Sequence, residues 1–116
     1  MKNTVIPITE GTRINQSFLH GLGGPPNFIL TYLLCTTADA ASGLVPGQGI
    51  PFDGQSLLDL AGAPAFGIVV DATKIYVSYT TLTAGGGNFN IAYLGLTKSL
   101  TSFSNFSLSI YYNRFN

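Results

Sequence analysis

Short runs of alternating apolar and polar residues, each ended by glycine or proline, constrain the fold of this chain more than any other feature. The run FSLSIYYNRF (106–115) places Phe106, Leu108, Ile110 and Tyr112 on one face and Ser107, Ser109, Tyr111 and Asn113 on the other. KIYVSYTT (74–81) alternates in the same way. Period-two alternation is typical of a β-strand with one face on the core. We therefore predict an all-β chain, an antiparallel β-sandwich of jelly-roll type with about seven or eight short strands.

The turn-forming residues divide the chain without marking a domain boundary. The 14 glycines and 6 prolines are spread along its 116 residues, so we expect one β-sandwich domain over 1–116. Residues 1–12 carry Pro7, which cannot donate a hydrogen bond to a neighbouring strand. This segment is expected to be an extended N-terminal arm or an edge strand. Residues 42–56, with four glycines and two prolines, predict a long loop.

The run NFILTYLLC (27–35) differs from the other predicted strands because both of its faces are apolar. Phe28, Leu30, Tyr32 and Leu34 line one face, and Ile29, Leu33 and Cys35 line the other. Such a strand lies in the middle of a structure or has its second face against a partner subunit. If Leu30 lies in the core, its replacement by alanine costs about 2–5 kcal/mol.

Charge is scarce in this chain. Only 9% of the residues are charged, against roughly 25% in an average soluble protein. The net charge is +0, so little repulsion keeps copies of the chain apart. We infer that other protein covers much of the surface, the alternative being a neutral monomer coated with serine, threonine and asparagine.

Several function classes receive no support from the sequence. The five basic residues are scattered, which argues against nucleic-acid binding through phosphates. Cys35 stands alone in an apolar run and is interpreted as a small buried hydrophobe. No apolar run approaches the ~20 residues that a membrane helix needs, and the first residues lack the apolar segment of a signal peptide.

The stretch HGLGGPP (20–26) holds the only histidine of the chain beside three glycines and two prolines. A dinucleotide-binding loop would lead into a helix, whereas this stretch leads into a strand. We interpret it as a structural corner in which glycines supply positive φ and the prolines set the direction of the next strand. The corner consists of His20, Gly21, Gly23, Gly24, Pro25 and Pro26.

His20 is the one residue that would carry catalysis. No histidine, cysteine or carboxylate lies at ligand spacing from it, which predicts no metal site and no cofactor. Residue counts leave a Ser-His-Asp triad open, but the chain has no GxSxG elbow. We predict that His20 ends a strand and bonds to backbone at the corner, and that the chain is not an enzyme.

Tyrosines on the predicted strands suggest either an interface or a carbohydrate surface. Tyrosine rings stack on sugar faces while amides bind hydroxyls, although strand tyrosines more often serve packing or interfaces. The candidate contacts for an interface or a glycan are Tyr76, Tyr93, Tyr111 and Asn113.

A set of consecutive segments resembles small β-sandwich proteins of tailed bacteriophage virions. They are HGLGGPP, NFILTYLLCTTADA, SGLVPGQGIPF, DATKIYVSYTT and FSLSIYYNRF, and they span most of the chain from about residue 14 onward. Members of that family tend to carry an acidic GDE-like turn in the glycine-rich loop. Here GQGIPFDG (47–54) replaces it, which leaves any role of that turn in doubt.

The resemblance implies a structural protein of the virion, made in the cytoplasm of the host bacterium. Within that family a capsid decoration (cement) protein is favoured, because a separate chain of this length is shorter than most fibres. A tail-fibre or adaptor module that binds host glycan is the alternative. The expected partners are copies of this chain, with a trimer favoured, and other virion proteins such as the major capsid protein. The face that carries Tyr111 or Ile29 is expected to be buried between chains.

Overall fold

The computed structural model describes residues 1–9, 13–51, 57–58, 66–80, 88–91, 96–99 and 101–116. Its strands form three sheets in which all the pairs are antiparallel. The first sheet has the strand order β1 (Lys2–Pro7), β10 (Phe106–Asn113), β3 (Phe28–Cys35) and β4 (Gly49–Pro51). The second has the order β2 (Arg13–Leu19), β7 (Lys74–Thr80) and β6 (Phe66–Val70). The third has the order β5 (Leu57–Leu58), β8 (Asn88–Ile91) and β9 (Leu96–Ser99).

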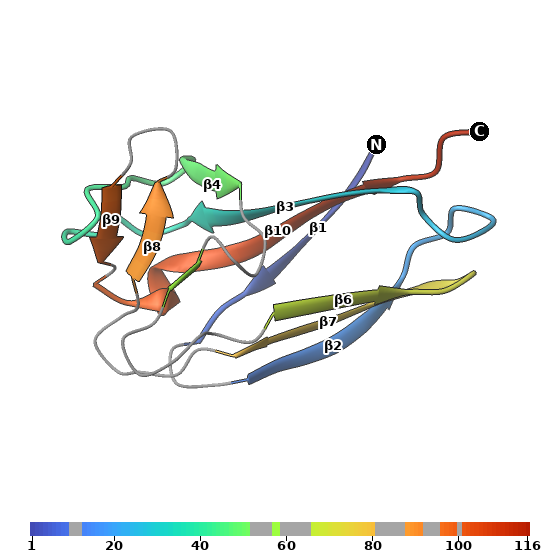
Figure 1. Ribbon diagram of the computed structural model, residues 1–116, viewed down its shortest axis with the longest axis horizontal. Coiled ribbons are helices and arrows are strands. Elements are labelled where there is room, and N and C mark those ends of the chain that lie inside the picture. The colour runs from blue at the N-terminus through green and yellow to red at the C-terminus, as the bar shows by residue number, and fades with distance from the viewer. Residues whose placement is uncertain (10–12, 52–56, 59–65, 81–87, 92–95, 100) are drawn as a thin grey trace.

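The first two sheets lie one above the other as an open sandwich, with both termini at the same end (Figure 1). The first and last strands are neighbours in one sheet, and β2 pairs with β7 in the other. The prediction of an all-β antiparallel sandwich is confirmed. The two facing sheets contain seven strands, in agreement with the expected number, and the three short strands of the third sheet add to them.

The core lies between the facing sheets. Phe18 of β2 and Tyr112 of β10 meet across it with ring centroids 5.4 Å apart. Tyr79 of β7 packs edge-on against Phe103, which belongs to the 3-10 helix η2 (Phe103–Asn105). The buried apolar side chains are Ile6, Ile8, Leu33, Cys35, Ile75, Val77, Tyr79, Phe103, Phe106, Leu108, Ile110 and Tyr112.

Strand β10 follows the predicted alternation on its inner face but departs from it on the other. Phe106, Leu108, Ile110 and Tyr112 are buried as expected. Ser107 and Ser109 were expected on a wet or half-wet face, yet they are 5% and 3% exposed. The two serines are buried because β10 is a central strand between β1 and β3, where larger side chains of the neighbouring strands flank them.

Two further segments differ from the prediction or refine it. Residues 49–51 lie within the predicted long loop but form β4, because their backbone pairs with Tyr32 to Leu34 of β3. Strand β1 is an edge strand of the first sheet, where Pro7 needs no partner for its missing N–H.

Strand β3 divides its two apolar faces between the core and the surface. Its pairing with β10 places Leu33 and Cys35 on the inner face with Leu108 and Phe106. Ile29 is half-buried on that same inner face, so it does not belong to the surface that carries Tyr111. Leu30 is 36% exposed and lies on the outer face, where the condition for a large effect of its replacement is not met.

The outer faces of the two facing sheets differ in charge and not in apolar exposure. The second sheet exposes Leu19, Val69 and Tyr76 beside the polar Asn15, Ser17 and Ser78, and it also carries Lys74. The first sheet presents no lysine, arginine, aspartate or glutamate at its outward positions. We call this surface the apolar outer face; it consists of Asn3, Val5, Pro7, Phe28, Leu30, Tyr32, Leu34, Gly49, Pro51, Ser107, Ser109, Tyr111 and Asn113.

Candidate functional site

The corner at residues 20–26 carries the chain from the second sheet to the first (Figure 1). Gly21 and Gly23 have φ of 65° and 78°, the left-handed region that side chains disfavour. The guanidinium of Arg114 occupies the space that a side chain at Gly24 would take. Pro25 and Pro26 follow, and β3 begins two residues later at Phe28.

His20 is buried at this corner, and both of its ring nitrogens form hydrogen bonds with backbone groups. The Leu22 N–H donates to Nδ1 over 3.0 Å, so Nδ1 carries no hydrogen. The hydrogen is therefore on Nε2, which donates to the Asp71 carbonyl over 3.0 Å. The His20 backbone N–H donates to the Thr73 carbonyl, and the Lys2 ammonium donates to the His20 carbonyl over 2.7 Å. One residue thus joins β1, the corner and the turn between β6 and β7.

This arrangement gives the imidazole a structural task. A general base or a metal ligand must present a free ring nitrogen to its partner. Here either nitrogen reaches a substrate or ion only after one of the two backbone bonds is broken. The geometry therefore favours the interpretation that His20 has a structural role and holds the corner to the neighbouring segments by hydrogen bonds.

Replacement of His20 by alanine is expected to lower the free energy of unfolding by about 2 kcal/mol, because two buried hydrogen bonds are lost at about 1 kcal/mol each. Urea denaturation measures the loss. In the unaltered protein, ¹⁵N NMR of the ring is expected to show the hydrogen on Nε2. An unchanged urea midpoint, or a hydrogen on Nδ1, would contradict this structural role.

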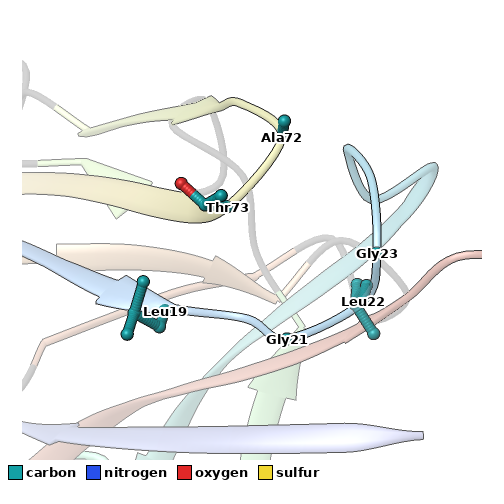
Figure 2. A pocket seen from close by; sticks show the side chains of 6 residues that line it. All are labelled: Leu19, Gly21, Leu22, Gly23, Ala72 and Thr73. Atoms are coloured by element: carbon teal, nitrogen blue, oxygen red, sulfur yellow. The ribbon is translucent and has the colours of Figure 1, made fainter.

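A shallow apolar groove of about 410 Å³ lies beside the corner. Figure 2 shows it between Leu19 to Gly23 on one side and Ala72 and Thr73 on the other. The only side-chain heteroatom in its lining is the Thr73 hydroxyl, which donates to the Asp71 carboxylate over 3.3 Å. The groove offers apolar contact and no reactive group.

Asp71 organises the turn that faces the corner. Its Oδ1 accepts the backbone N–H groups of Thr73 and Lys74, and its Oδ2 accepts the Tyr76 hydroxyl over 2.9 Å. These bonds, led by that of Thr73, lower the pKa of Asp71 to about 2, and the same carboxylate raises the pKa of Tyr76. Sequence analysis missed this role, although an aspartate at a turn between two strands is a usual signal for it.

The residues predicted as interface or glycan contacts do not form one surface. Tyr76 points outward from the second sheet, whereas Tyr111 points outward from the first, on the opposite side of the sandwich. Asn113 ends β10 on the same outer face as Tyr111, and its side-chain oxygen accepts the Arg114 N–H. Tyr93 lies outside the described residues.

Tyr111 instead borders a small cleft in the apolar outer face. Its ring meets that of Tyr32 edge-on, with centroids 5.8 Å apart. The hydroxyl of Ser109, at the floor, accepts the Asn3 amide over 2.9 Å. The volume of the cleft is about 180 Å³, and its lining is Tyr32, Leu34, Gly47, Gly49, Ser109 and Tyr111.

A second buried polar group, Asp39, was missed entirely by sequence analysis. Asp39 is 1% exposed, and its carboxylate accepts hydrogen bonds from the nearby Ser42 and from a segment more than 60 residues further along the chain. The donors are the Ser42 N–H and hydroxyl, the Thr101 and Ser102 N–H groups and the Asn105 amide. Burial raises the pKa of Asp39, but the bonds from Ser42, Asn105 and Thr101 outweigh burial and leave it below its usual value. Asp39 therefore ties the loop after β3 to the segment before β10.

Within the described ranges, no group of three or more histidine, cysteine or carboxylate side chains is placed to hold a metal ion. The same part of the chain contains no helix with the length and hydropathy to span a membrane. Comparisons with protein-family models, curated proteins and solved structures find no match to this chain.

Proposed function

We propose that this chain is a structural protein of a bacteriophage virion, and specifically a capsid decoration protein that stabilises the head through contacts between subunits. The observation that carries the proposal is the apolar outer face. This face has no charged side chain and leaves Val5, Leu30 and Tyr111 exposed to solvent by 36% or more. Contiguous apolar surface of this kind marks a site of protein contact.

The chemistry of this face suits an apolar protein contact better than a charged one. Cores of protein interfaces are depleted in charged residues and enriched in tyrosine. Tyr32 and Tyr111 supply ring area, while the buried hydroxyl of Ser109 already accepts a hydrogen bond from Asn3. Burial of the face therefore requires no charge to be removed from water.

The resemblance to virion β-sandwich proteins supports the same assignment. The segments that carry it include the corner at His20 and strands β3, β7 and β10. In the proposed setting the chain is made in the host cytoplasm and becomes part of the particle, with copies of itself and the major capsid protein as partners.

Tyr111→Lys is expected to weaken particle binding at least about tenfold, because an ammonium group would have to be buried in an apolar contact at about 1.4 kcal/mol or more. The measurement is co-sedimentation of the full chain with shells of the major capsid protein of the same virion. Tyr76→Lys is the matched control, since Tyr76 is similarly exposed on the opposite sheet. Equal binding by the two variants would remove the apolar outer face from the contact, and a wild-type chain that binds no shell or tail component would overturn the virion assignment.

A tail-fibre or adaptor module that binds host glycan is the second candidate, supported by the cleft between Tyr32 and Tyr111. Aromatic walls with a hydroxyl at the floor suit one neutral sugar ring, because aromatic rings bind apolar sugar faces and the cleft is far smaller than the ~300 Å³ at which drug-sized sites begin. A glycan array probed with the assembled protein tests this function. Binding that Tyr111→Lys abolishes would favour it over capsid decoration.

A further inference from the structure

We infer that the apolar outer face packs against the same face of a second copy of this chain, related by a two-fold axis. The inference rests on the proposed function, because it names the partner that covers this face while the chain is not bound to a particle. Three features carry it: the area of the face, the contact of Tyr111 with Ser107 that the pairing creates, and the lack of charge.

The area of the face is large enough for a specific protein–protein interface at the lower limit of size. Strands β3 and β10 have eight residues each, which corresponds to about 27 Å at ~3.4 Å per residue. With the shorter β1 and β4 at ~4.8 Å spacing, the four strands cover about 400 Å² of flat area. The relief of the side chains raises the accessible area above this figure. Two faces together then bury about 1,000 Å², the lower limit for a specific interface, which predicts a reversible pair.

The register of the sheet places a symmetry axis at one row of residues. Val5, Ser109 and Tyr32 lie opposite one another on β1, β10 and β3. If a two-fold axis runs along this row, in the plane of the interface, each of the three residues faces the same residue of the second copy. The same half-turn exchanges the two neighbouring rows, which lie on either side of the axis.

Those neighbouring rows complement each other in size at one position. One row contains Tyr111 beside Leu30, and the other contains Ser107 beside Leu34. The half-turn therefore lays the large Tyr111 ring over the small Ser107 of the other copy on each side of the axis, and it lays Leu30 over Leu34. A large side chain over a small one favours close packing between two sheets.

Charge also favours a copy of this chain as the partner. A face with charged residues meets like charges when it packs on itself across a two-fold axis, which disfavours the pair. The apolar outer face has no such residue, and the net charge of the chain is +0. Neither local nor overall repulsion therefore opposes the pairing.

Chemical cross-linking of the full chain tests the axis. Val5→Cys is expected to give cross-linked dimers with a short bismaleimide, which spans the ~10 Å between packed sheets that a disulfide cannot. Val69→Cys is the matched control, since Val69 is an exposed strand valine on the opposite sheet. It should give none. The unaltered chain controls for the native Cys35, which is buried.

Sedimentation equilibrium of the unaltered chain, from micromolar to millimolar concentration, gives the mass. A reversible dimer together with Val5→Cys cross-links supports the inference. A trimer, or cross-links through Val69→Cys, would overturn the two-fold pair. A chain that stays monomeric but binds particles in a Tyr111-dependent way would overturn the pair and leave the proposed function standing. A chain that neither pairs nor binds particles would overturn both.

Discussion

Replacement of Asp39 by alanine is expected to lower the free energy of unfolding by about 3–5 kcal/mol, because several donors lose their acceptor at about 1–3 kcal/mol for each one left buried. Three of these donors belong to Thr101, Ser102 and Asn105, more than 60 residues further along the chain. The loss is a large part of the stability of a small domain. Urea denaturation followed by circular dichroism measures it.

Two further variants make this prediction decisive if the alanine variant does not fold. Asp39→Asn keeps one acceptor oxygen, so a smaller loss is expected, and its stability should no longer depend on the ionisation of residue 39. Asp71→Ala removes a carboxylate that also accepts several bonds, but in an exposed turn, and is expected to cost less. Equal losses for Asp39→Ala and Asp71→Ala would contradict the role of burial.

The same carboxylate predicts a dependence on acid. The pKa of Asp39 is lowered in the folded state from its usual 3.8. The folded state therefore binds its proton less readily than the unfolded state does, and the stabilisation is fully present above that value. It is lost as the pH falls through the lowered pKa. The acid limb of stability should be shallower in Asp39→Asn than in the unaltered chain.

Replacement of Leu33 by alanine is the second large effect, with an expected loss of about 2–5 kcal/mol. Leu33 is 1% exposed on the inner face of β3, opposite Leu108, so its removal leaves a cavity between the sheets. The measurement is again urea denaturation of the purified chain.

Leu30→Ala on the same strand is the matched control. Leu30 faces outward and is partly exposed, so its replacement removes little buried area and is expected to cost less than about 1 kcal/mol in the isolated chain. A loss as large as that of Leu33→Ala would mean that the two faces of β3 had been assigned the wrong way round.

The sequence was sufficient to predict strands and their spacing but not which face of β3 is inside. Period two separates Leu30 from Leu33 into opposite faces, yet both faces are apolar, so hydrophobicity alone cannot choose between them. The choice is made by pairing with β10, whose Leu108 and Ile110 form the inner row. For Ser107 and Ser109, burial follows from the central position of β10, which depends on strand order.

The hydrogen bonds of the two aspartates also differ in how far apart their partners lie in the sequence, and this decides which could be predicted. The three bonds of Asp71 come from residues within five positions of it, so the turn was within reach of sequence analysis. The donors to Asp39 include Thr101 and Asn105, which are far from it in the sequence and lie beside it only in the folded chain. The glycine corner was predictable because positive φ at Gly21 and Gly23 is a local property.

Hydroxyl-radical footprinting of tyrosines, read by mass spectrometry, tests the central claim most directly. The account predicts that Tyr111 reacts in the dilute chain and becomes protected when the chain assembles with its own copies or on a particle. Tyr76, on the opposite outer face, should react equally in both states. Protection of Tyr76 with no change at Tyr111 would contradict the claim that the apolar outer face is the surface through which this protein assembles.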